Sequence, residues 1–243
     1  MMRRRPHLFS ILQASLHNLK KRGTVFARIR YEPDMTAGNA DDLAAKPKTL
    51  DHVHAAAVPL AALTAWQALF SHAMLTRGQR VLIHGGAGGV GGFAVQMANW
   101  AGATVITTAA ADNHDFVRQL GAQEVIDYAK VHFEDEVSDV DVVLDTIGGS
   151  TLQRSFGVLR QGGTLVSIVE PPSAEKAKAQ GIKGEFFIVE PDRTQLEEIG
   201  RLIDTGRLRA FVDSVLPIEQ ARQAFEQGLK GHSRGKIVLR IAG

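Results

Sequence analysis

A cluster of glycines between an apolar run and a helical pattern constrains this chain more than any other feature. Residues 81–83 form a short β-branched run typical of a buried strand, and the spacing Gly86-x-Gly88-x-x-Gly91 follows directly. Apolar residues then recur at helical spacing, at Val90, Ala94, Met97 and Ala98. Glycines in this position allow a tight turn, close approach of a pyrophosphate and close packing of helix on strand. The stretch therefore predicts a dinucleotide-binding loop.

Strand and helix patterns alternate from residue 79 onward. We expect strands at 80–84, 103–108, 123–127, 140–145, 163–169 and 184–189, and helices at 88–101, 113–120, 149–159, 173–180 and 192–205. Such alternation implies right-handed crossovers and a parallel sheet. With the glycine loop after the first strand, it predicts an α/β fold with a doubly wound parallel sheet. A strand near 211–215, a helix at 217–229 and a strand at 236–241 complete the pattern.

The part before the glycine loop is less regular. Residues 6–19 have helical spacing, and Thr24–Tyr31 alternates weakly, as a strand does. Leu50–Phe70 is rich in alanine and helix-forming, with Pro59 breaking it in two and Asp51 placed to cap the first piece.

Charge is distributed unevenly along the 243 residues. Residues 1–31 carry eight Lys or Arg and no acid, so the remaining 20 Lys and Arg face all 26 Asp and Glu. A basic, acid-free start resembles a mitochondrial presequence, and a solvated leader of a cytoplasmic protein is the alternative. No aromatic platform accompanies the charges and no apolar run is long enough to span a membrane, so neither nucleic acid nor membrane is an expected partner.

Several kinds of catalytic site are excluded or unsupported. The chain has no cysteine, which removes thiolate nucleophiles and cysteine-based zinc sites. Its nine histidines show no ligand spacing with an acid beside them on one helix, so we expect no metal. No serine lies in a G-x-S-x-G context. We therefore name no catalytic side chain.

Four stretches, in order, resemble one enzyme family. They are the glycine loop at 84–98, Leu63-Thr64-Ala65-Trp66-Gln67-Ala68-Leu69, the Leu-Gly-Ala-x-x-Val-Ile-Asp-Tyr stretch at 120–128, and Gly235-Lys236-Ile237-Val238-Leu239. Together they resemble the medium-chain dehydrogenase/reductase superfamily, in its zinc-independent quinone oxidoreductase-like branch, over about residues 43–243. The family carries a longer GroES-like β domain before the Leu-Thr-Ala-Trp helix. The resemblance thus implies a leader with a remnant of that domain at 1–50, a Rossmann domain at 51–210 and a C-terminal segment at 211–243.

The resemblance also implies where a cofactor binds. The amides of Gly89 and Val90 face its phosphates from a helix N-terminus. No acid ends the second strand at Thr107–Ala111, which favours NADP over NAD, although Asp112 opposes a 2′-phosphate and His114 is the only nearby base before Arg118. Asp112 or Asn113 is expected to cap the next helix. The implied cofactor-binding residues are Thr64, Gln67, Gly88, Gly89, Val90, Thr108, Ala110, His114, Tyr128, Ile147, Ile168, Val169, Ile188, Val189 and Lys236.

Among these, Gln67, Ile147, Ile168, Val169, Ile188, Val189 and Lys236 are expected around the nicotinamide, in an apolar slot that suits hydride transfer. The alternative for each isoleucine is ordinary sheet core, and for Tyr128 a plain surface tyrosine.

The implied function is NADPH-dependent hydride transfer to a small-molecule quinone or α,β-unsaturated carbonyl. A nucleotide-binding homologue without turnover and a zinc-free alcohol dehydrogenase are the alternatives. The family pairs subunits along its sixth strand, so a homodimer is expected here through Lys183–Val189, with Phe186 in the interface.

Overall fold

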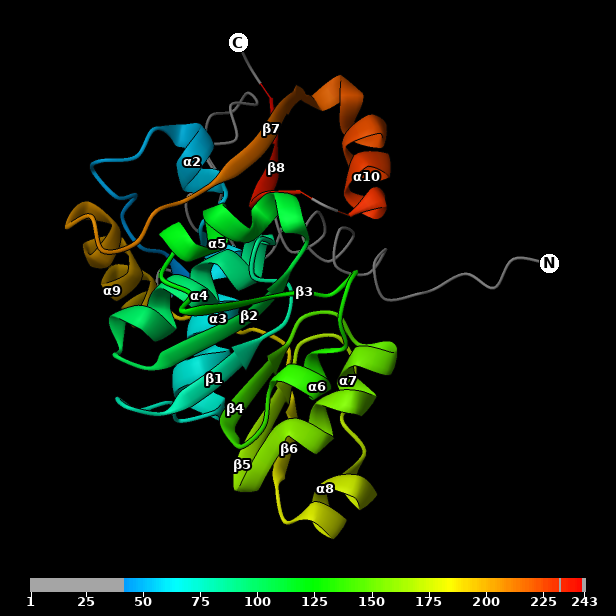
Figure 1. Ribbon diagram of the computed structural model, residues 1–243. Helices are drawn as coiled ribbons and strands as arrows, with labels where there is room; N and C mark the ends of the chain where they lie inside the picture. Colours follow the sequence, from blue (N-terminus) through cyan, green and yellow to red (C-terminus); the bar gives the residue numbers. More distant parts are fainter. Residues whose placement is uncertain (1–41, 232, 242–243) are drawn as a thin grey trace.

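Six parallel strands form one twisted sheet at the centre of the molecule (Figure 1). The computed structural model describes residues 42–231 and 233–241. The sheet has the order β3-β2-β1-β4-β5-β6, which is the order of doubly wound dinucleotide-binding domains. Its strands are β1 (Arg80–Ile83), β2 (Thr104–Ala109), β3 (Glu124–Asp127), β4 (Val140–Asp145), β5 (Leu159–Ser167) and β6 (Lys183–Phe186). The predicted fold class is confirmed. The helix expected at 6–19 and the strand at 24–31 lie outside the described residues.

Side chains of β1 show why helices cover both faces of this sheet. Val81 and Ile83 point into one apolar cluster, and Leu82 between them points into the other. All three are fully buried, as expected for a central parallel strand with no solvated face. The first cluster receives the helices α3 (Pro59–Trp66), α4 (Gly89–Trp100), α5 (His114–Gln119) and α9 (Arg193–Asp204). The second receives α6 (Phe133–Glu136), α7 (Gly149–Ser155) and α8 (Ala174–Gln180).

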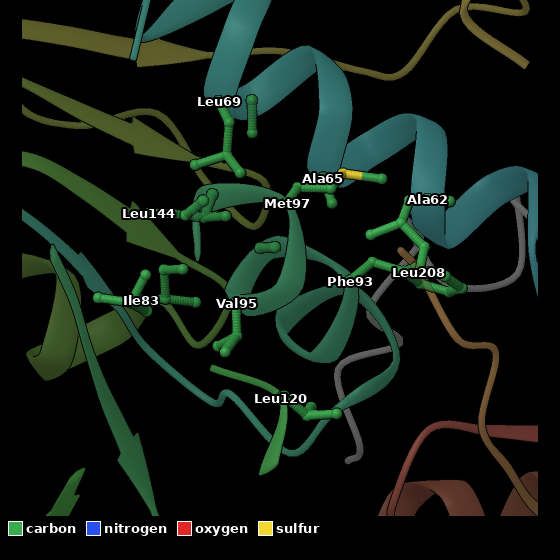
Figure 2. Packing of buried hydrophobic residues seen from close by; sticks show 14 of the residues in the cluster. Ala62, Ala65, Leu69, Ile83, Phe93, Val95, Met97, Leu120, Leu144 and Leu208 are labelled. Carbon is green, nitrogen blue, oxygen red and sulfur yellow. The ribbon is translucent and has the colours of Figure 1, made fainter. Parts of the chain in front are cut away.

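Small side chains let α3 approach α4 closely. Ala62 and Ala65 of α3 face Phe93 and Met97 of α4 (Figure 2). The predicted break at Pro59 is confirmed, because α2 (His52–Ala56) ends before it and α3 begins on it. The predicted cap is confirmed too, since the side chain of Asp51 accepts a hydrogen bond from the amide of His54 at 2.7 Å. A π-helical turn (Gln67–His72) then continues α3.

Several boundaries differ from the sequence prediction. The helix expected at 149–159 ends at Ser155, a 3-10 turn follows at Phe156–Val158, and β5 begins at Leu159. Leu159 starts the strand early because it pairs with Val140 across a register shift between Val140 and Val142. The strand expected at 184–189 ends at Phe186, where its pairing with β5 ends. The short helix α6 was not predicted.

The last segment forms a separate two-stranded parallel sheet. Strand β7 (Val212–Pro217) pairs with β8 (Lys236–Arg240), and α10 (Ala221–Lys230) connects them after a 3-10 turn at Ile218–Gln220. In Figure 1 these elements lie together beyond one edge of the large sheet. A bridge between Gly88 and Gly235 joins this segment to the glycine loop. The expected strand, helix and strand are confirmed, whereas the domain boundaries at 50 and 210 stay predictions.

Candidate functional site

The loops that follow β1, β2 and β4 meet at the carboxyl edge of the sheet. The chain runs outward from β1 through β2 to β3 on one side and from β4 to β6 on the other, so the strand order reverses between β1 and β4. Ligands of open α/β sheets bind in the crevice at such a reversal. The glycine loop follows β1 and therefore lies at this crevice.

Each glycine of the loop has a different steric reason. A Cβ on Gly86 would collide with the side chain of Thr107, and one on Gly91 would collide with the carbonyl of Gly85. These two glycines thus allow strand, loop and helix to pack closely. A Cβ on Gly88 would lie 3.2 Å from the Gly85 carbonyl, a contact tighter than side chains normally make. The helix α4 begins at Gly89 without a side-chain cap, which leaves its first amides for an anion.

The C-terminal segment crosses over this loop. The amide of Gly235 donates to the carbonyl of Ala87 at 3.1 Å, and Gly88 and Gly235 form a bridge. A Cβ on Gly89 would collide with the side chain of Lys236, which therefore lies against the phosphate loop. β8 starts beside Gly89, and the expectation that Lys236 approaches the nicotinamide end stays a prediction.

Lys236 has the properties of an anion-binding group. Its ammonium makes no hydrogen bond or ion pair within residues 42–231 and 233–241. Burial lowers the pKa of this amine, because no carboxylate compensates for the lost hydration. A bound phosphate would supply the missing charge partner. The side chain of Lys236 lies beside the loop that carries the first amides of α4, so both favour the same ligand.

The loop after β2 is held by an arginine from far along the chain. The Nε atom of Arg234 donates to the Oδ1 atom of Asn113 at 2.5 Å, and its Nη2 atom donates to the carbonyl of Asp112 at 2.5 Å. The guanidinium also lies over the ring of Phe116, 5.9 Å from its centroid. The expected cap is wrong: Asn113 begins α5 without a side-chain cap, because its side chain binds Arg234 instead.

Arg234 also changes the expectation that His114 is the base nearest this loop. His114 lies at the start of α5, and its buried Nε2 atom has no hydrogen-bond partner among the described residues. Sequence reasoning missed Arg234 because it stands 121 residues from Asn113. The only local signal was its place beside Gly235 and Lys236.

A buried histidine supports the start of the glycine loop. His84 is fully buried, and its Nε2 atom lies 3.0 Å from the hydroxyl of Ser155, which itself donates to the carbonyl of Thr151. The Ser155 hydroxyl therefore accepts from Nε2–H. The hydroxyl of Thr108 accepts from the amide of Gly85 at 3.1 Å and donates to Nδ1 of His84 at 3.3 Å. These bonds require a neutral imidazole.

The loop after β4 is fixed by a buried carboxylate. Asp145 accepts from the amides of Ile147 and Gly148 at 3.0–3.1 Å and from the hydroxyl of Ser167 at 2.8 Å. These bonds turn the side chain of Ile147 toward the glycine loop, where a Cβ on Gly85 would lie 3.2 Å from it.

The residues expected around the nicotinamide divide into two groups. Ile147, Val169 and Ile188 are 55%, 47% and 77% exposed, so Ile147 and Ile188 are not sheet core. Ile168 and Val189 are half-buried and pack against the first apolar cluster. The described residues therefore leave part of this apolar surface exposed, and the apolar slot around a nicotinamide stays a prediction.

Two polar residues expected at the cofactor are used within the protein. The side-chain amide of Gln67 donates to the carbonyl of Glu190 at 2.8 Å and accepts from its amide at 3.1 Å. Gln67 thus clamps the segment after β6 against α3. The hydroxyl of Thr64 donates to the carbonyl of Leu60 in its own helix.

The other expected residues lie in or beside the loops that follow β1, β2 and β3. The hydroxyl of Thr108 makes the hydrogen bonds to Gly85 and His84 described above. Ala110 precedes the 3-10 turn at 111–113. Val90 is half-buried in the first turn of α4. Tyr128 is 53% exposed just beyond β3, which fits a surface tyrosine as well as a cofactor contact.

Within the described part of the chain, no group of three His, Cys, Asp or Glu side chains could hold a metal ion. Among the described helices, none is both long enough and apolar enough to cross a membrane.

Comparison with known proteins identifies the family. A family model described as zinc-binding dehydrogenase matches residues 120–239. A probable zinc-binding oxidoreductase, mitochondrial, of Arthroderma benhamiae is 36% identical over an alignment of 239 residues. The alignment covers 89% of this chain and 72% of that protein. A mitochondrial NAD(P)H oxidoreductase of Mus musculus is 32% identical over 84% of this chain and 59% of its own length.

Solved structures agree. A quinone oxidoreductase from Coxiella burnetii has a TM-score of 0.77 and 35% identity, covering 81% of this chain and 63% of that one. A mycobacterial protein solved in complex with NADPH has a TM-score of 0.72 and 27% identity, covering 80% of this chain and 66% of that one. The chain thus spans about three fifths of the mouse and Coxiella relatives. The glycine loop, the strand order and these relatives together show that the chain belongs to the medium-chain dehydrogenase/reductase superfamily, in its quinone oxidoreductase-like branch.

Proposed function

We propose that this chain binds NADPH and transfers hydride to a quinone or an α,β-unsaturated carbonyl. One observation carries the proposal: the side chain of Lys236, whose ammonium has no partner among the described residues, lies against Gly89 at the uncapped start of α4. Both features favour an anion, and the strand order places that anion at the crevice. The names of the relatives, which include NAD(P)H and quinone oxidoreductases, support a nicotinamide cofactor.

The residues present fit such a cofactor. The first amides of α4 and Lys236 would hold the pyrophosphate, and the loop after β2 would hold the adenosine ribose. Ile147, in the loop after β4, and Val169, just beyond β5, would give the nicotinamide an apolar wall. When bound, the cofactor supplies the hydride, and the protein supplies position and exclusion of water.

We propose that the reaction proceeds without zinc. The absence of cysteine and the lack of a ligand spacing in the sequence support this, although the matching family model is described by zinc binding. Zinc titration of the purified chain tests the point, and stoichiometric zinc bound after dialysis contradicts it.

A second candidate is a nucleotide-binding chain without turnover. The exposure of Ile147, Val169 and Ile188 favours it, because hydride transfer is helped by a site that excludes water. A zinc-free alcohol dehydrogenase is a third candidate, supported by likeness to an NAD-dependent alcohol dehydrogenase with a TM-score of 0.73 and 28% identity.

Calorimetry and a turnover assay separate these candidates. NADPH binding by the wild type is expected, with affinity reduced in Lys236→Gln and unchanged in Lys178→Gln, a control on exposed α8. NADPH oxidation with 9,10-phenanthrenequinone or an enone supports the reductase. Binding without turnover supports the second candidate, and oxidation of alcohols supports the third. Absence of any nicotinamide binding contradicts all three.

The predicted homodimer and localisation are also proposals. Strand β6 is an edge of the sheet, and Phe186 on it is 39% exposed, which supports pairing of two chains there. The mitochondrial names of two relatives support a mitochondrial address over the cytoplasmic one. A fluorescent fusion of the chain, imaged with a mitochondrial marker, tests the address.

A further inference from the structure

Three successive residues of the C-terminal segment reach three successive parts of the candidate cofactor site. Arg234 binds the loop after β2, Gly235 pairs with the glycine loop, and Lys236 lies against the start of α4. The Cα atoms of Arg234 and Lys236 are at most about 7 Å apart, because they are two residues apart. The segment therefore places Arg234 at the loop after β2 and Lys236 at the glycine loop.

Gly235 fixes this arrangement. Its φ of 85° lies in the left-handed region, and a Cβ there would collide with the carbonyl of Phe211. The amide of Lys236 donates to that same carbonyl at 3.1 Å. Only glycine fits the backbone conformation between the two cations, so this conformation keeps Arg234 and Lys236 directed at different loops.

The loop after β2 is where a Rossmann domain distinguishes NAD from NADP. An acid there binds the ribose hydroxyls of NAD, and an arginine nearby accommodates the 2′-phosphate of NADP. Arg234 uses Nε and Nη2 to bind Asn113 and Asp112, while its Nη1 atom makes no hydrogen bond to any described residue. The guanidinium is therefore oriented at the loop with one donor nitrogen free.

We propose that Arg234 recognises the 2′-phosphate of NADPH and thereby sets the cofactor preference of this chain. The inference rests on the proposed binding of a nicotinamide cofactor. Arg234 brings a positive charge to the loop that carries Asp112, a residue that by itself opposes a 2′-phosphate. A planar guanidinium gives fixed donors for phosphate oxygens, and the backbone carbonyl of Asp112 and the side chain of Asn113 hold that plane in place.

Direct binding of NADPH and NADH to the wild type and Arg234→Gln tests the proposal. NADPH affinity is expected to fall at least tenfold in the variant, with NADH affinity changing less than threefold. Arg222→Gln, an exposed arginine on α10, is the matched control and keeps both affinities. An equal loss for both cofactors in Arg234→Gln overturns the proposal, since it shows that Arg234 only holds the loop.

Two further measurements keep the test decisive. Arg234→Met keeps an aliphatic side chain over Phe116 without the charge, and it is expected to lose NADPH affinity but not NADH affinity. Arg234→Lys restores a cation and is expected to recover part of the NADPH affinity. For the wild type, 2′,5′-ADP is expected to bind at least tenfold more tightly than 5′-AMP, and equal affinities overturn the proposal whether or not the variants fold. Equal wild-type affinity for NADPH and NADH overturns it while leaving the proposed function intact, whereas binding of neither overturns the proposed function itself.

Discussion

Acidification is expected to destabilise this protein through His84. The imidazole is fully buried between the hydroxyls of Ser155 and Thr108, and the ring of Phe133 packs edge-on against it at 4.5 Å. Burial and, secondly, the nearby guanidinium of Arg154 lower the pKa of His84 to about 3. Protonation would require both ring nitrogens to donate, and Nδ1 faces a hydroxyl whose proton already points at it.

The size of the effect follows from the two pKa values. The unfolded chain has a His84 pKa of 6.5, so between that value and about 3 it binds a proton that the folded chain does not. Stability is therefore complete above pH 6.5 and is lost as the pH falls through this window. Each pH unit within it costs about 1.4 kcal/mol, so the loss between pH 7 and pH 5 is about 2 kcal/mol.

Urea unfolding at pH 7, 6 and 5 measures this loss. The free energy of unfolding of His84→Gln is expected to fall by about 2 kcal/mol less than that of the wild type over this range, because glutamine does not titrate. His52→Gln, on an exposed position of α2, is the control for removing a histidine and keeps the wild-type slope. Identical pH slopes for the wild type and His84→Gln would refute the argument that His84 is held neutral.

Three further predictions test the cofactor site and the assembly. Gly89→Val is expected to abolish NADPH binding in calorimetry, because its side chain would occupy the phosphate position and displace Lys236, and unchanged affinity contradicts the site. Asp112→Arg is expected to raise the NADPH-to-NADH affinity ratio about tenfold by adding a phosphate contact; an unchanged ratio places the 2′-phosphate elsewhere. Light scattering is expected to show a dimer at micromolar concentration. Phe186→Lys is expected to weaken this dimer, because it buries a charge in the interface. A folded wild-type monomer at that concentration contradicts the prediction.

The sheet could be predicted because its signals are local. Val81–Ile83 and Val142–Leu144 are apolar runs of β-branched and leucine side chains, each bounded by polar or glycine residues, so each reads as a buried strand without knowledge of its neighbours. The spacing of the glycine loop is similarly local, since the atoms that a Cβ on Gly86 or Gly91 would meet belong to residues 85–107. With right-handed crossovers, these two features were enough to predict a doubly wound parallel sheet.

The start of β5 could not be predicted from such signals. Residues 156–163 contain three glycines and no alternation, and Leu159 becomes part of a strand only because Val140 pairs with it. Exposure of Ile147 and Ile188 was equally hidden, since apolar residues at strand ends have the same pattern whether they line a surface or fill a core. Only the paths of the neighbouring loops distinguish the two.

Arg234 shows why the adenosine side of the site needed the structure. No residue within 100 positions of Asn113 predicts that Arg234 is its partner, because the two meet only where β8 returns to the glycine loop. A signal did exist in the sequence, namely a glycine between two cations just before an apolar strand. Its meaning depends on the φ of Gly235 and on the carbonyl of Phe211, neither of which a pattern of residue types encodes. On the proposal that Arg234 binds the 2′-phosphate, the cofactor preference of this chain depends on where its last strand docks as well as on the residues that end its second strand.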